Sequence, residues 1–174
     1  MQELLESILA AAPTDTIAAR LGLSKEQTET GLGALLPALT GAAQKKIRSE
    51  GGLGALVDLL GGGAFERHVD EPEKASLDEV VGEGNGILGD LFGSKETSRE
   101  VANEASKKTG IDAGILKKLL PIAAALLVGF LAKKGKEGKG GLGDILGGLL
   151  DKDGDGSILD DIVGGALGGL LGGK

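Results

Sequence analysis

Pairs of large apolar residues recur every three or four positions along much of the chain, and this spacing predicts helices. Such spacing places a continuous apolar stripe on one face of a helix. β-branched residues are sparse, and no segment alternates apolar with polar residues as a strand does. The pattern therefore predicts an all-α protein. It is clearest in residues 158–171, which contain the pairs Ile158-Leu159, Ile162-Val163, Ala166-Leu167 and Leu170-Leu171.

One order of elements occurs twice. Residues 17–63 and 101–150 each begin with a short helix, turn at a glycine, and continue into a longer helix that contains Leu-Leu-Pro. Ser24 and Asp112 follow the two turns and are typical N-caps for the longer helices. We expect the prolines to kink or restart these helices, because proline removes a helix hydrogen bond.

The repeat divides the chain into four predicted segments. Residues 1–65 and 98–139 are the two related helical-hairpin halves, and residues 66–97 are an acidic linker with a short Gly/Leu helix. Residues 140–174 are a Gly-rich tail with a helix, an acidic loop and a second helix. The longest apolar run, 119–132, is shorter than the ~20 residues that span a membrane. We expect this run to be a buried core helix.

Glycine alternates with the apolar pairs. The chain contains 33 glycines, and residues 51–63, 84–94, 140–150 and 164–173 combine them with leucine or isoleucine. Each interior glycine destabilises a helix by about 1 kcal/mol relative to alanine. Close contact between helix backbones explains both features, because glycine permits it. The pattern predicts self-association through glycine faces, as a homo-oligomer or a filament.

Composition and charge exclude several classes of function. With no Cys and one His, the chain cannot form disulfides, a thiolate metal site or a multi-His site. The net charge of −7 disfavours general binding to nucleic acid. Residues 98–139 carry 9 basic and 4 acidic groups, which we interpret as a solvated helix face, with a basic patch as the alternative. No catalytic constellation is present, so we expect no enzymatic activity.

An acidic segment beginning at Asp151 has the pattern that opens an EF-hand calcium loop. Carboxylates occupy loop positions 1, 3 and 5, and glycine at position 6 permits the sharp turn. Ile162 stands at position 12 in place of the usual bidentate glutamate, which predicts weak binding. The alternative is an acidic turn that caps the next helix. The predicted calcium ligands are Asp151, Asp153, Asp155, Ser157, Asp160 and Asp161.

Residues 16–32 have the pattern of a helix-turn-helix, with small residues before the turn and a cap after it. In a DNA-binding protein the second helix would read the major groove. That helix opens with Lys25 but also carries Glu26 and Glu29, which phosphates repel. We therefore expect a hairpin used for packing.

Three segments carry a family resemblance: LGLS…ALLPAL, TGID…KLLPIAAALLVGFLAKK and GLGDILGGLLDKDGDGSILDDIVG. Together they resemble a bacterial family, the domain of unknown function 937, which includes the YidB-like proteins. The resemblance covers most of residues 1–170. It implies an all-α fold with a homeodomain-like helical core, and it implies no established activity.

These patterns predict a non-enzymatic protein that is structural or self-associating and stabilised by calcium, and the family resemblance implies that it is bacterial. One alternative is an acidic DNA-associated or regulatory protein that uses the helix-turn-helix-like segment. Another is a peripheral membrane protein with residues 111–134 on lipid. Residues 1–13 lack the positive charge of a secretory signal. We therefore expect a cytoplasmic location, with non-classical export as the alternative.

Overall fold

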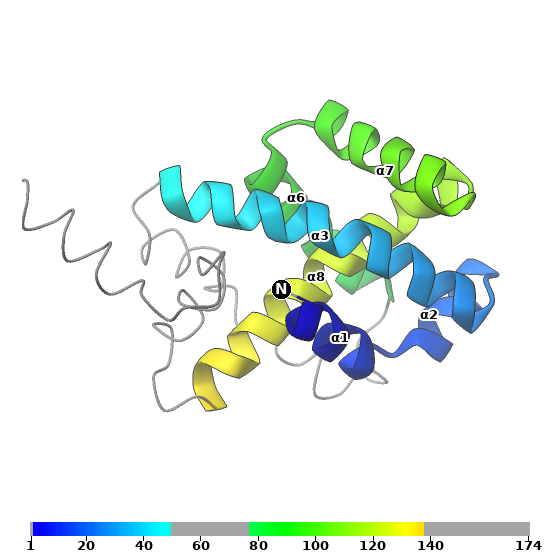
Figure 1. The fold of residues 1–174 in the computed structure, drawn as a ribbon, viewed down its shortest axis with the longest axis horizontal. Coiled ribbons are helices and arrows are strands. Elements are labelled where there is room, and N and C mark those ends of the chain that lie inside the picture. The colour runs from blue at the N-terminus through cyan, green and yellow to red at the C-terminus, as the bar shows by residue number, and fades with distance from the viewer. Residues whose placement is uncertain (1, 50–76, 138–174) are drawn as a thin grey trace, which may run out of the picture.

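Helices account for nearly all of the chain that the computed structural model describes, which is residues 2–49 and 77–137 (Figure 1). No strand occurs in these two ranges, and the predicted all-α class is confirmed for them. The predicted tail, 140–174, lies outside them. The described helices are α1 (Gln2–Ala11), α2 (Thr14–Leu21), α3 (Lys25–Ser49), α6 (Leu77–Phe92), α7 (Lys95–Thr109) and α8 (Ala113–Glu137).

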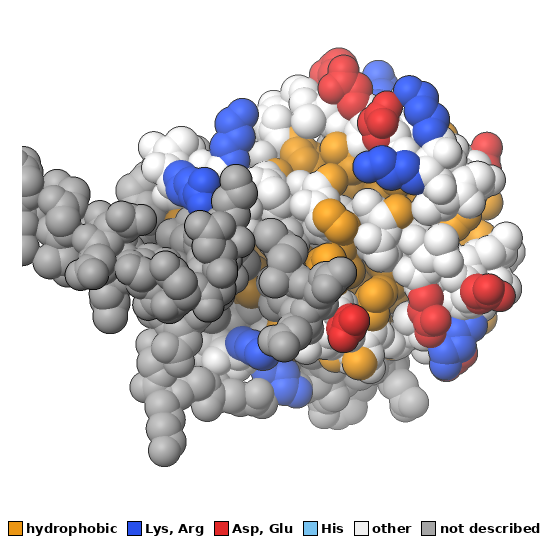
Figure 2. Space-filling model, in the orientation of Figure 1, with side chains coloured by type: hydrophobic (Ala, Val, Ile, Leu, Met, Phe, Trp, Pro, Cys, Tyr) orange, Lys and Arg blue, Asp and Glu red, His pale blue; other side chains and the backbone are white. Residues whose placement is uncertain are grey.

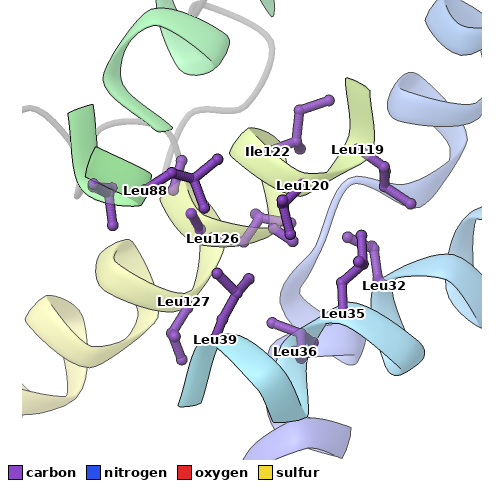
Figure 3. Close-up of a cluster of buried hydrophobic side chains, with 14 of the residues drawn as sticks. Leu32, Leu35, Leu36, Leu39, Leu88, Leu119, Leu120, Ile122, Leu126 and Leu127 are labelled. Carbon is purple, nitrogen blue, oxygen red and sulfur yellow. The ribbon is translucent and has the colours of Figure 1, made fainter. Parts of the chain in front are cut away.

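The two longest helices, α3 and α8, cross in the middle of the fold and supply most of the core (Figure 1). Every residue of α8 from 119 to 129 is buried, as the long apolar run predicts. A helix that is apolar around its whole circumference belongs at the centre of a bundle. Figure 3 shows the leucines of α3 facing those of α8, and four of the α3 leucines are 0% exposed: Leu32, Leu35, Leu36 and Leu39.

The two predicted turns have the same local geometry. Gly22 and Gly110 end their helices with φ of 69° and 74°, in the left-handed region that favours glycine. Ser24 caps α3: its hydroxyl accepts from the Gln27 N–H at 3.1 Å, and its own N–H donates to the Gln27 side chain at 3.0 Å. Asp112 caps α8 by accepting from two backbone N–H groups at 2.8 and 3.2 Å. The predicted N-caps are confirmed.

Neither proline restarts its helix. Both α3 and α8 continue through their prolines, Pro37 and Pro121, for more than two further turns. Pro37 is exposed, and Gly33, whose carbonyl loses its hydrogen-bond donor, is half-exposed, so water can satisfy that group. Pro121 is buried at the crossing of α8 with α6. Tertiary packing on both sides of each proline outweighs the lost hydrogen bond.

The segment predicted as a linker contains a helix of the core. Residues 77–92 form α6, and its Ile87 and Leu88 are buried in the same cluster as the leucines of α3 and α8. Figure 3 shows Leu88 pointing toward α8. Helices from both predicted halves therefore share one core. Where the segments begin and end stays a prediction, since residues 50–76 lie outside the described part.

Glycines of α6 have two different environments. Gly84 lies so close to α8 that a Cβ added to it would overlap the backbone carbonyl of Pro121. This close backbone contact lies within one chain, whereas the glycine pattern is interpreted above as a surface for self-association. On the opposite side, Gly82, Gly86 and Gly89 are exposed, and a Cβ added to any of them would meet nothing within 4 Å. Gly84 therefore lets α6 pack closely on α8, whereas the other three glycines lie on a side of α6 that the described residues leave open.

Candidate functional site

The predicted calcium loop lies outside the described residues, so its six ligands stay a prediction from the sequence: Asp151, Asp153, Asp155, Ser157, Asp160 and Asp161. Within residues 2–49 and 77–137, no group of three or more His, Cys, Asp or Glu side chains is placed to hold a metal ion. The tail remains the candidate metal site of this chain.

The helix-turn-helix-like segment forms α2, its glycine turn and α3. The Leu23 N–H donates to the Ala18 carbonyl at 2.9 Å and closes the turn. At the start of α3 the ammonium group of Lys25 lies 3.2 Å from the Asp15 carboxylate, so this base is already paired. Glu26 and Glu29 are exposed beside it. A duplex backbone approaching this end of α3 would meet net negative charge.

By length and composition alone, residues Ala113–Gly135 of helix α8 are long and apolar enough to cross a membrane. This stretch contains the apolar run 119–132 that the sequence marks, with two lysines on each side of it. However, 83% of its most apolar window is buried inside the fold. For α8 to lie in lipid, it would have to leave its contacts with α3, α6 and α7.

A hollow of about 550 Å³ lies where α6 ends, α7 begins and α8 passes beside them. Two leucines, Leu88 of α6 and Leu120 of α8, form its apolar floor. Three cations line it: Lys95 and Arg99 from the first turns of α7, and Lys117 from α8. Neutral polar groups complete the lining, and they include the side chains of Asn85, Ser94 and Ser98.

Sequence reasoning missed this cluster. Residues 98–139 are interpreted above as a solvated helix face, with a basic patch as the alternative, and the fold turns Arg99 and Lys117 of this segment toward one hollow. Lys95, outside that segment, joins them. The spacing of Lys95 and Arg99, four residues apart, indicates that they share a helix face. No sequence pattern indicates that α8 brings Lys117 beside that face, because this depends on how α7 packs on α8.

A separate ion pair lies on the surface of α7. The Lys107 ammonium is 2.8 Å from the Glu104 carboxylate, and this hydrogen bond and charge lower the pKa of Glu104 and raise that of Lys107. Both side chains are well exposed. Solvent therefore screens the pair, which contributes little to stability.

Comparison with known proteins identifies a family. A family model described as "Bacterial protein of unknown function (DUF937)" matches residues 3–134, from α1 into the last turns of α8. The match ends before the predicted calcium loop, so it does not extend over the tail included in the resemblance above. No curated protein and no solved structure matches the chain.

Proposed function

The chain belongs to the bacterial DUF937 family, which is described as being of unknown function, and we propose that the protein is a non-enzymatic structural protein that associates with itself and is stabilised by calcium. The observation that carries the proposal is an uncharged face of α3 that the described helices leave open. The calcium part rests on the sequence of the tail.

Small residues form this open face of α3. Residues 31–43 contain no charged side chain. The outward positions have helical spacing and are exposed or half-exposed, and we name them the α3 face: Pro37, Ala38, Gly41 and Ala42. They extend over roughly 8 Å of helix at 1.5 Å per residue.

The α3 face suits close contact with another helix. Figure 2 shows apolar side chains in the middle of the side of the molecule that α3 crosses, with most of the charged side chains nearer its edge. An apolar centre with a polar rim is typical of protein interfaces. Small residues also allow two backbones to approach closely.

We expect Gly41→Glu to weaken self-association by at least about tenfold, because a buried, unpaired charge opposes association. A Cβ at Gly41 would meet nothing within 4 Å, so the change leaves the fold intact. Light scattering across a concentration series measures the effect. Asn103→Glu, on the exposed side of α7, is the matched control.

Wild-type protein that stays monomeric at high concentration, with and without calcium, would overturn the proposal. Equal association of wild type and Gly41→Glu would exclude the α3 face. In that case Gly165→Leu and Gly168→Leu test the glycines of the tail. The leucine side chains would block the close approach of a second helix without lowering the apolar content.

We expect calcium to stabilise the protein by about 2.7 kcal/mol when its concentration is 100 times its dissociation constant. Asp151, Asp153 and Asp155 repel one another when no cation is bound, and an ion would remove this repulsion. Thermal melts in excess calcium and in chelator measure the difference. Asp153→Ala should lose the response, and Asp90→Ala, an exposed change outside the loop, should keep it. Identical melting temperatures with calcium and with chelator would refute the site.

The two alternatives make different demands on the fold. DNA association would use the N-terminal end of α3, where Lys25 is paired with Asp15. A complex that survives competitor DNA in a gel shift would favour this alternative.

Peripheral membrane binding would require α8 to be released from the core. Co-sedimentation with vesicles, together with loss of the cooperative melt, would favour that reading.

A further inference from the structure

The hollow between α6, α7 and α8 has the features of a ligand site, and we propose that it binds the phosphate group of an amphipathic organic phosphate. Its volume of about 550 Å³ lies within the range of small-molecule sites, roughly 300–1,000 Å³. The proposal is independent of self-association and of the calcium loop.

Charge supports an anion in this hollow. Lys95, Arg99 and Lys117 line it, and none of them pairs with an acidic side chain in the described part of the chain. The neighbouring acids of α7, Glu96 and Glu100, do not line it. In a chain of net charge −7, three cations around one hollow, without an acidic partner among the described residues, form a local field that attracts an anion.

The kinds of side chain favour phosphate. A guanidinium group donates two parallel hydrogen bonds to phosphate oxygens, and ammonium groups add point charges. A phosphate monoester carries nearly two negative charges at neutral pH, which suits three cations better than a single carboxylate does. Ser94 and Ser98 line the same edge, but their hydroxyls already bond within the first turn of α7, to Thr97 and to the Ser94 carbonyl.

The floor of the hollow favours an apolar group attached to the phosphate. Leu88 and Leu120 line it and are 6% and 1% exposed. Gly89 and Gly93 line it as well and have no side chain to fill the space. A short hydrocarbon chain on the ester oxygen can therefore lie on the leucines while the phosphate meets the cations. A free organic phosphate and the headgroup of an anionic lipid both offer this chemistry.

Titrations of the full-length protein with inorganic phosphate, butyl phosphate and octyl phosphate test the proposal. We expect affinity to rise along this series, by about fourfold for each methylene group that becomes buried. Arg99→Gln and Lys117→Gln should each weaken octyl phosphate binding by at least about tenfold. Lys118→Gln removes the same charge from the next residue of α8, which does not line the hollow, and should have little effect.

A second pair of variants tests the location without changing charge. Gly89→Leu places a side chain in the hollow, whereas Gly86→Leu places one on α6 outside its lining, and neither position has an atom within 4 Å of an added Cβ. We expect the first change to abolish binding and the second to preserve it. Equal effects of the two changes, or of the Lys117 and Lys118 changes, would overturn the proposal, as would no binding of octyl phosphate.

Vesicles distinguish the two sources of the phosphate. The vesicles contain phosphatidic acid and phosphatidylcholine. If they retain the wild-type protein and Lys118→Gln but not Arg99→Gln or Lys117→Gln, the ligand is a lipid headgroup. Binding of octyl phosphate without retention on these vesicles would identify a free organic phosphate. Retention lowered equally by all three changes would indicate general surface attraction and would overturn a lipid ligand in the hollow.

Discussion

We expect Gly84→Ala to lower the free energy of unfolding by about 3 kcal/mol, a typical upper value for an overpacked contact. The added Cβ would overlap the carbonyl group of Pro121 and lie 2.8 Å from its Cα. A backbone cannot move aside as a flexible side chain can, so α6 would have to shift away from α8. Such a shift would also loosen Ile87 and Leu88, which are buried in the core.

Gly86→Ala is the matched control for this prediction. It makes the same chemical change two residues along α6, where an added Cβ meets nothing within 4 Å. There the higher helix propensity of alanine should raise stability by up to about 1 kcal/mol. Urea denaturation followed by circular dichroism measures both variants, since the chain has no Trp or Tyr for fluorescence. Equal effects would show that Gly84 does not hold α6 against α8.

We expect Leu39→Ala to lower the free energy of unfolding by about 3 kcal/mol, within the usual range for a buried leucine. Leu39 is 0% exposed and points from α3 toward Leu126 and Leu127 of α8 (Figure 3). Its truncation would remove apolar contacts and leave a cavity between the two longest helices. The same denaturation experiment measures the loss.

Leu23→Ala is the control for this prediction, because it shows how much stability is lost when a leucine outside the core is truncated. Leu23 lies in the turn between α2 and α3, is half-buried and does not belong to the core cluster. We expect its truncation to lower stability by less than about 1 kcal/mol, because it has less apolar surface to lose. Similar losses in both variants would contradict a core built at the crossing of α3 and α8.

Local features of the fold could be predicted from the sequence. The caps Ser24 and Asp112 bond to N–H groups two or three residues away, and the left-handed glycines, Gly22 and Gly110, end the helices that precede them. These interactions join residues within one turn of the chain, so residue type and spacing determine them. The apolar run in α8 likewise predicts its burial.

Contacts between helices were decided only by the tertiary structure. The sequence marks residues 66–97 as an acidic linker with a short Gly/Leu helix, yet the helix formed there, α6, packs in the core, where Gly84 meets Pro121. The hollow, too, depends on α8 placing Lys117 beside α7. The sequence around a glycine or a lysine has the same pattern whether that residue faces solvent or another helix. Which face is covered depends on the angle and position at which two helices cross, and these follow from how all the side chains pack together.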